Sequence, residues 1–491
     1  MDRRTFLERS FFAAGGVALG SLPFAEAAGE PPMLGIQVGA VSFVDEGTDK
    51  VLDNFREMAS INTLFLATFT YGRGIAGRQP RGSALPDHGK QEYDDDYHGG
   101  NFATPHPHYY RGTAIAPEKA PDHPNYDVIA DVLPAAHRRS MKVICWFEDV
   151  FRKDVRGLDQ AVEIDLHGNP TTRTCPRNPN TRNFWLGMVE DYLRSYDVDG
   201  LMWGSERQGP LNNAMGASHG GGGNPTTVGC FCPHCLEAAR KMGIDADRAR
   251  KGYGILESWV TSMRAGARPA DGAFVTFWRI LVEYPEVLAW ERLWNEGLRD
   301  TYRDMYRKSH EIAPSKGIGW HLWHTNSFAP FYRAEQDYAE FSNYSDFLKV
   351  VMYNNSGGPR MAQYIRNVNA TLFADLTPEQ TLELTYRIQQ YGDEKRLDRI
   401  SQEGLSADYV RRETRRAVAG VSPKVKIWPG IDIDIPTGAR EKKTQPDDVY
   451  AAVKAAFDGG AHGVLLSRKY SEMTLANLRA AGRAVRDLKI A

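Results

Sequence analysis

The chain has 491 residues, with 60 basic against 62 acidic side chains, and 11% of its residues are aromatic. This length can bury one large core or two domains of ordinary size. The nearly balanced charge gives no reason to expect a nucleic acid or an anionic membrane as the main partner. The 10 Trp and 22 Tyr residues suit core packing, and such a surplus of rings also suits stacking against sugars.

The first residues are typical of an export signal rather than of the fold. Residues 2–7 (DRRTFL) resemble the twin-arginine signature, a modest apolar run follows over 11–24, and residues 25–27 (AEA) have the spacing of a cleavage site. We therefore expect residues 1–27 to be a twin-arginine signal peptide and the protein to be periplasmic or secreted. An uncleaved anchor is the alternative. No other stretch is long and apolar enough to cross a bilayer, so we expect no membrane span after cleavage.

Short apolar runs alternate with helical stretches along the rest of the chain. The expected strands are residues 34–43, 63–71, 142–148, 200–206, 318–324, 347–355, 424–434 and 463–470. Eight such βα units predict an α/β fold, a (β/α)8 TIM barrel with large βα-loop insertions. We expect one barrel domain over residues 33–491, with a cysteine-rich loop and a helical insertion at about 207–317. A doubly wound open sheet is the alternative, but no Gly-rich phosphate turn follows the first strand.

Polar and aromatic side chains gather at the carboxyl ends of these strands, where barrel enzymes have their active sites. Because buried polar groups need partners, this concentration predicts a pocket for a polar ligand. We expect these residues to bind a carbohydrate substrate: Trp146, Glu148, Trp203, Arg207, Trp323, His324, Tyr353, Asn354, Trp428 and Asp434. His321 and His324 point to opposite faces of a strand, and we choose His324 for the pocket because it is nearer the strand end.

Two carboxylates at the same end are the expected catalytic residues. Glu206 ends the fourth strand, and alternation along the seventh strand turns Ile431 and Ile433 toward the helices and Asp432 and Asp434 toward the pocket. An opposed pair, Glu206 and Asp432, is what cleavage of a glycosidic bond needs. As the general acid/base, Glu206 would have a pKa raised by a neighbouring Trp or carboxylate. A structural role is the alternative for either Asp, as a loop cap or an Arg partner.

The cysteines are the most specific local signal. Cys230, Cys232 and Cys235 lie within six residues at the start of a helix and can converge on one soft tetrahedral ion, with Cys175 as the fourth ligand. We expect a structural zinc and no organic cofactor; zinc could be loaded in the cytoplasm before folded export. A disulfide or a redox pair is the alternative. The odd total of five Cys does not favour full pairing.

Residues 175–179 (CPRNP), then a helix, a strand ending in Glu206, and the C-x-C-x-x-C of residues 230–235 resemble the family-42 glycoside hydrolases, the barrel β-galactosidases. The match covers about residues 175–240. It implies a glycosidase in which Glu206 is the acid/base and the cysteines hold zinc. The chain has Ser205 where that family has Asn, and an Asp where its seventh strand carries a Glu nucleophile. As a whole, the chain is more similar to glycosyl-hydrolase-like barrels of exported bacterial proteins.

The sequence thus predicts an exported glycoside hydrolase that cleaves a glycosidic bond with carboxylates on strands four and seven. One alternative is a metal-dependent sugar isomerase or epimerase, with the metal held by Glu148, His324 and Asp434. Another is a non-catalytic carbohydrate-binding barrel. The sequence carries no signal for the sugar, the linkage or the oligomeric state.

Overall fold

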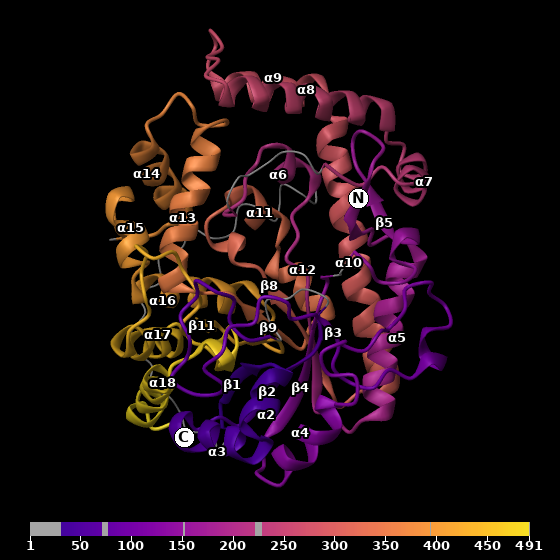
Figure 1. Cartoon of the computed structure of the whole chain (residues 1–491). Helices are drawn as coiled ribbons and strands as arrows, with labels where there is room; N and C mark the ends of the chain where they lie inside the picture. The colour runs from indigo at the N-terminus through magenta and orange to yellow at the C-terminus, as the bar shows by residue number, and fades with distance from the viewer. Residues whose placement is uncertain (1–30, 71–76, 151–152, 221–227, 393, 491) are drawn as a thin grey trace. The chain divides into compact units, whose positions relative to one another are not determined.

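The centre of the structure, a computed structural model, is a curled parallel sheet surrounded by helices (Figure 1). Its strands are β1 (Met33–Val38), β2 (Thr63–Thr70), β4 (Lys142–Glu148), β7 (Gly200–Gly204), β8 (Gly317–Leu322), β9 (Phe347–Val350), β10 (Lys426–Ile427), β11 (Gly430–Asp432) and β12 (Gly463–Ser467). Their order is β10-β9-β8-β7-β4-β2-β1-β12-β11.

The structure describes residues 31–70, 77–150, 153–220, 228–392 and 394–490. The expected signal peptide, residues 1–27, lies outside the described residues. Met33–Ala491 forms one compact unit. Within the described residues, no helix is long and apolar enough to cross a membrane.

The seventh expected strand is split in two, and the split closes the sheet. β10 pairs with β9, whereas β11 pairs with β12 on the other side. Pro429 lies between the two halves and has no N–H to donate to a ladder. A bridge from Val351 to Gly430, with Met352 N donating to Gly430 O at 3.1 Å, joins the sixth strand to β11. The sheet therefore returns on itself, and the expected α/β TIM-barrel fold is confirmed.

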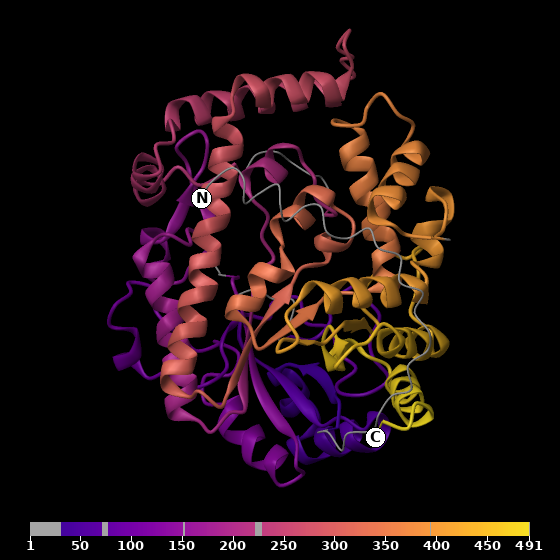
Figure 2. The same ribbon diagram turned by 180° about the vertical axis from the view of Figure 1, so that it is seen from behind.

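The helices that follow the barrel strands are α2 (Ala40–Glu46), α3 (Thr48–Ala59), α4 (Val128–His137), α5 (Pro179–Ser195), α10 (Glu286–Ile312), α11 (Pro330–Glu335), α12 (Tyr338–Phe341), α13 (Asn354–Asn369), α14 (Pro378–Gln389), α15 (Leu397–Glu403), α16 (Ala407–Gly420), α17 (Pro446–Asp458) and α18 (Leu475–Asp487). α10 packs along α5, and α16, α17 and α18 pack in series, as both views show (Figures 1 and 2). α5 begins where Asn178 accepts a hydrogen bond from Asn180 N and Pro179 fixes the first helical turn.

Further elements lie in the connections between strands. The connection from β7 to β8 contains α6 (Pro210–Ala214), α7 (Pro233–Lys241), α8 (Ala246–Arg264) and α9 (Ala273–Glu283) ahead of α10. The short elements elsewhere are β3 (Gly100–Asn101), β5 (Val162–Ile164), β6 (Pro170–Thr174), and the 3-10 helices η1 (Pro107–Tyr110), η2 (Leu158–Gln160), η3 (His324–Ser327), η4 (Ser342–Tyr344) and η5 (Tyr470–Glu472). α8 packs on α9 and on α10 beyond the barrel (Figure 1).

Several expected strands extend too far at their carboxyl ends. The first was placed at 34–43, but β1 ends at Val38 and the apolar run continues as α2. A short apolar run cannot be assigned to strand or buried helix by periodicity alone. The fifth was placed at 318–324, but β8 ends at Leu322 and His324 begins η3. These shifts change which side chains face the barrel mouth.

Alternation along the strands separates an inner core from an outer one. Phe65, Trp146, Met202 and Phe347 pack together inside the barrel, with Trp428 against them. The intervening side chains pack on the helices in the larger core cluster. The barrel interior is therefore filled, and a ligand can reach only its ends.

Substitution of Gly319 tests how tightly the barrel interior is packed. A Cβ at Gly319 would lie 2.4 Å from the Phe347 ring and from the Phe347 carbonyl oxygen. We expect Gly319→Ala to lower the free energy of unfolding by about 1–3 kcal/mol, measured by urea denaturation. Gly254→Ala is the matched control, since its Cβ would meet nothing within 4 Å in helix α8, and it should be neutral or stabilising. Equal effects of the two changes would contradict the packing described.

Candidate active site

Four residues form one row across adjacent strands at the barrel mouth. Glu148 is opposite Gly204, Gly204 is opposite His321, and His321 is opposite Lys349 in the registers of β4, β7, β8 and β9. Because side chains of one row point to the same face, the three functional side chains enter the barrel together. A Cβ at Gly204 would lie 3.3 Å from His321 Cβ and 3.7 Å from Glu148 Cγ. The glycine therefore keeps the two side chains close to each other.

Glu206 stands above this row, two residues after Gly204. Its side chain is 50% exposed, whereas Glu148, His321 and Lys349 are buried. Many protein atoms nevertheless surround the carboxylate, since burial is the leading influence on its pKa. A carboxylate that is both crowded and reached by water is accessible to a ligand at the barrel mouth.

A chain of hydrogen bonds holds Glu206. His321 Nε2 lies 2.8 Å from Glu206 Oε1, His321 Nδ1 lies 3.0 Å from Lys349 Nζ, and Lys349 Nζ donates to Tyr353 Oη at 2.8 Å. An ammonium only donates, so Nδ1 accepts from Lys349 and Nε2 carries the proton that is donated to Glu206. Burial and the Lys349 charge lower the pKa of His321, so the ring is neutral at pH 7. Lys349 therefore selects the tautomer that orients the carboxylate.

The two carboxyl groups at the mouth have pKa values far apart. Burial, joined by repulsion from Glu206, raises the pKa of Glu148 to about 8. Burial also acts to raise the pKa of Glu206, but the hydrogen bond from His321 and the charges of Arg360 and Lys349 outweigh it and lower the value to about 2. Burial lowers the pKa of Lys349 to about 7. At neutral pH the site thus combines a protonated carboxyl with an ionised one.

The expectation of a raised pKa for Glu206 was wrong. Trp203 does not border the carboxylate; its ring packs outward, with its centroid 5.5 Å from that of Trp185 and 5.1 Å from that of Tyr302. The hydrogen bond from His321, which lies 115 positions away in the chain, supplies the lowering.

His321, rather than His324, contacts Glu206. His324 is fully buried, its Nδ1 accepts from Arg360 at 3.1 Å, and its Nε2 lies 3.1 Å from Tyr409 Oη. Both ring nitrogens of His324 therefore have protein partners. That His324 binds substrate stays a prediction, and these contacts weigh against it.

Backbone and side-chain donors occupy the two carboxylates that were expected on the seventh strand. Asp432 is fully buried, Ser356 N donates to it at 2.7 Å, and burial raises its pKa to about 6. β11 ends at Asp432, so the alternation stops there, and Asp434 has a φ of 56°. Thr474 N and Asn477 Nδ2 donate to Asp434 at 2.7 and 2.8 Å. These contacts provide the structural role that was the alternative for each Asp, while the catalytic role of Asp432 stays a prediction.

The other expected substrate ligands are dispersed. Trp146 and Trp428 lie inside the barrel, where Trp428 stacks on Phe347 at 4.1 Å between ring centroids. Trp323 is partly buried, and the centroid of its ring lies 4.9 Å from that of the His219 ring. Tyr353 and Asn354 are buried at the start of α13, and Asn354 Oδ1 has no hydrogen-bond partner among the described residues.

Four thiols converge on one point beside α5 and α7. The sulfurs of Cys175, Cys230, Cys232 and Cys235 lie within 4.8 Å of one another, and the Cys175–Cys235 and Cys175–Cys232 pairs are both 3.6 Å apart. A disulfide would need about 2.05 Å. Four thiolates around a tetrahedral ion with bonds of about 2.3 Å stand about 3.8 Å apart. The cluster therefore fits a metal ion, and all four cysteines are free and buried.

A buried polar network joins this cluster to the strand that carries Glu206. Arg207 donates to the carbonyl oxygen of Thr174, the residue before Cys175, at 2.6 Å. Arg207 also pairs with Glu163 at 2.7 Å and with Asp149 at 3.3 Å. Asp149 accepts from both Thr174 Oγ1 and Ser205 Oγ at 3.2 Å. This network thus connects the residues on both sides of Glu206 to the segment that leads into Cys175. It also uses the guanidinium of Arg207 that was expected to bind substrate.

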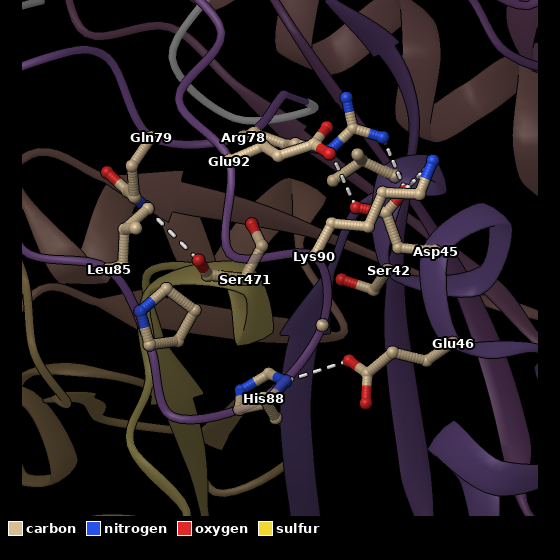
Figure 3. Close-up of a pocket in the computed structure, with 13 residues that line it drawn as sticks. Ser42, Asp45, Glu46, Arg78, Gln79, Leu85, His88, Lys90, Glu92 and Ser471 are labelled. Carbon is tan, nitrogen blue, oxygen red and sulfur yellow. Dashed lines mark hydrogen bonds and ion pairs between the residues drawn. The ribbon is translucent and has the colours of Figure 1, made fainter.

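A small pocket elsewhere on the barrel does not contain these groups. It lies between α2, the 77–92 segment and η5 (Figure 3). Arg78 Nε donates to Asp45 at 2.7 Å, His88 Nδ1 lies 2.8 Å from Glu46, and Gln79 Nε2 donates to Ser471 O at 3.2 Å. These hydrogen bonds are made within the protein, and they hold the long loop after β2 against the barrel.

Sequence reasoning missed His321, Lys349 and Arg360. Lys349 was detectable, because it alternates with the buried Phe347 in an apolar strand, and a buried Lys is rare unless it has a partner. Arg360 lies on α13, whose first residues were expected to belong to the strand at 347–355. No local sequence pattern distinguishes Arg360 from an ordinary surface arginine.

No protein-family model and no curated protein matches the sequence. Among solved structures, the chain is similar to the β-galactosidase of the psychrophilic Marinomonas ef1, with a TM-score of 0.50 and 11% identity over 93% of this chain and 59% of that one. It also matches the glycoside hydrolase domain of PgaB (BpsB) from Bordetella bronchiseptica, with a TM-score of 0.47 and 13% identity over 93% of this chain and 99% of that one.

A third match is α-L-fucosidase isoenzyme 2 from Paenibacillus thiaminolyticus, with a TM-score of 0.46 and 11% identity over 93% of this chain and 49% of that one. This chain thus spans about half of the length of the fucosidase and 59% of the length of the β-galactosidase. At 11% identity, the likeness to the Marinomonas β-galactosidase concerns the fold alone.

Metal analysis tests the thiol cluster. We expect about one tightly bound divalent metal per chain, lost in Cys232→Ser together with several kcal/mol of stability, because a closed four-thiolate site contributes its binding free energy to folding. Elemental analysis and thermal unfolding measure both effects. Cys145→Ala is the control, since Cys145 is buried in β4 outside the cluster. Metal-free wild-type protein of unchanged stability would contradict the assignment.

Proposed function

We propose that the chain is an exported glycoside hydrolase in which Glu148 and Glu206 act on one glycosidic bond. The separation of their pKa values, about 8 and about 2, carries this proposal. Glycosidases need one protonated and one ionised carboxyl group at the same pH, and opposite environments provide them. The resemblance to family-42 enzymes at residues 175–240 and the barrel fold support the same reaction class.

The residues divide the reaction between them. The Glu148 carboxyl donates its proton to the leaving oxygen, and the ionised Glu206 carboxylate attacks the anomeric carbon or activates a water molecule. The anomeric configuration is retained if Glu206 attacks directly and inverted if it activates water. The neutral His321 ring holds the Glu206 carboxylate in place, and Lys349 keeps the proton of that ring on Nε2.

We propose Glu148 as the partner of Glu206 in place of Asp432. Asp432 is 0% exposed and accepts backbone hydrogen bonds, whereas Glu148 retains 8% exposure and shares its row with the residues that hold Glu206. A proton donor must touch the leaving group, and Glu148 is the less enclosed of the two carboxyl groups.

The remaining proposals concern metal and location. The four-cysteine site would hold zinc. With four thiolate ligands the ion has no open coordination position, so it stabilises the structure and takes no part in the reaction. Residues 1–27 would direct the folded, metal-loaded protein through twin-arginine export. A metal-dependent isomerase has less support: among the residues that the structure describes, only the thiol cluster brings three or more Cys, His, Asp or Glu ligand atoms together.

Carboxamide substitutions assign the two roles. We expect Glu148→Gln to slow hydrolysis of glycosides with poor leaving groups by about 10²–10⁴-fold and to slow those with nitrophenolate leaving groups far less, because the latter need no protonation. Glu206→Gln should be inactive on both substrate types. A panel of aryl glycosides and oligosaccharides measures kcat/KM for each variant.

Asp432→Asn and Glu237→Gln accompany this comparison. Glu237 is an exposed carboxylate on α7 and serves as the control that should change nothing. Loss of all activity in Asp432→Asn with full activity in Glu148→Gln would return the second role to Asp432. Sugar binding without hydrolysis by the wild type would favour a non-catalytic barrel.

The pH profile follows from the two pKa values. Activity requires Glu206 ionised and Glu148 protonated, so kcat/KM should be flat at mildly acidic pH and fall as pH rises through about 8. The pKa of Lys349, about 7, lies close to that of Glu148 in the same site. The fall of kcat/KM at basic pH therefore reports the joint titration of Glu148 and Lys349. We expect this basic limb with glycosides that have poor leaving groups and only a weak one with nitrophenyl glycosides, which need no protonation, and Glu148→Gln should remove the limb. A limb unchanged in Glu148→Gln would assign it to another group.

A further inference from the structure

Arg360 brings a positive charge to the barrel mouth. It lies in α13 and is partly buried, with its guanidinium carbon 5.7 Å from the centroid of the Tyr353 ring. The same charge contributes to the low pKa of Glu206. Tyr353 is also the residue that accepts from Lys349. Arg360 thus lies against Tyr353, the residue that holds Lys349, and its charge acts on Glu206.

Arg360 is held by a neutral acceptor rather than by a carboxylate. Its NH1 donates to His324 Nδ1 at 3.1 Å, which leaves the proton of that ring on Nε2, toward Tyr409 Oη. Burial and the Arg360 charge lower the pKa of His324 well below its usual value, so the ring stays uncharged. The contact fixes the guanidinium but does not neutralise it.

Most other arginines that the structure describes as buried or partly buried pair with a carboxylate, although Arg177 donates to the Leu293 carbonyl oxygen at 2.6 Å. The pairs include Arg78–Asp45, Arg139–Asp53, Arg207–Glu163, Arg333–Glu413 and Arg468–Glu472. In the part of the chain that the structure describes, no carboxylate lies within 4.0 Å of the guanidinium of Arg360. An arginine fastened by a neutral histidine, beside a reactive carboxylate, keeps donors and charge available for a ligand.

We propose that Arg360 binds an anionic substituent, a carboxylate or a sulfate, on the sugar that occupies the site. The inference rests on the proposed carbohydrate site and narrows its substrate class to acidic sugars. Because the ionised Glu206 would repel such a group, a binding cation is needed beside it. The planar fork of Arg matches both carboxylate and sulfate, and His324 positions that fork.

Binding measurements on matched sugars test the proposal without turnover. The pairs are methyl β-glucuronide with methyl β-glucoside, methyl β-galacturonide with methyl β-galactoside, and methyl β-galactoside 6-sulfate with methyl β-galactoside. Calorimetry measures each Kd on Glu148→Gln, in which turnover of these methyl glycosides is suppressed, and on the same variant carrying Arg360→Gln. We expect the anionic member of at least one pair to bind more tightly, and Arg360→Gln to reduce that preference about 10- to 100-fold. Which pair responds identifies a carboxylate or a sulfate as the ligand group.

Two further variants separate a ligand role from a structural one. Arg360→Lys keeps the charge without the fork and should retain part of the preference. Arg366→Gln removes an exposed arginine from the same helix and should leave all affinities unchanged. Comparing anionic with neutral sugars cancels any effect of Arg360 on Glu206 or on folding, because such an effect would weaken both members of a pair.

No preference for the anionic member in any pair, or an equal loss for both members in Arg360→Gln, overturns the proposal. The outcome is distinct from failure of the proposed function. An Arg360-dependent preference in a protein that hydrolyses nothing would support this inference and refute the glycosidase. Hydrolysis of neutral glycosides with no such preference would refute only this inference.

Discussion

The site depends on one row of side chains, in which Glu148, His321 and Lys349 enter the barrel side by side with Gly204 between the first two. Taking a carboxyl and an ammonium out of water is costly, so each group relies on its neighbours. The charge in the row is small at neutral pH, because Glu148 is protonated, the His321 imidazole is neutral and the pKa of Lys349 falls to about 7. Glu206, half in solvent above the row, keeps the negative charge.

Hydrogen bonds connect the thiol cluster to the candidate active site. The cysteines lie in segments outside the barrel, but the residue before Cys175 receives a hydrogen bond from Arg207, which follows Glu206 in the chain. Asp149, which follows Glu148, accepts from Ser205 on the other side. The backbone after β4 and the backbone after β7 are thereby tied together. An ion held by the four thiols would stabilise the segment that leads into this network, and so the placement of the two carboxyl groups.

Much of the fold could be predicted from the sequence, because apolar runs at regular spacing mark buried strands whatever their partners are. The alternation that turned Ile431 and Ile433 outward and Asp432 inward is observed. Asp434 does not follow this alternation because the strand ends at Asp432. Where a strand ends depends on closure of the barrel. The first and fifth strands were overextended for a similar reason, since helical turns begin directly after their last paired residues.

The chemistry of the site was less predictable. Glu206 was identified from a local pattern, a carboxylate just past a buried strand. Its pKa depends on His321, Lys349 and Arg360, which lie far away in the chain. The register of β8 and β9 brings His321 and Lys349 together, and Arg360 comes from α13. The choice of His324 over His321 failed to find the contact to Glu206 because β8 ends at Leu322, two residues before His324. Periodicity gives the face of a side chain, but the exact end of a strand decides whether it reaches the mouth.

The central claim is that Glu148 stays protonated at neutral pH while Glu206 is ionised. Carbon-13 NMR of side-chain carboxyl groups, followed through a pH titration of the free protein, tests this most directly. The account predicts one Glu resonance that titrates near pH 8 and disappears in Glu148→Gln, and a second, absent in Glu206→Gln, that stays ionised down to about pH 2. Titration of both carboxyl groups near pH 4 would contradict it.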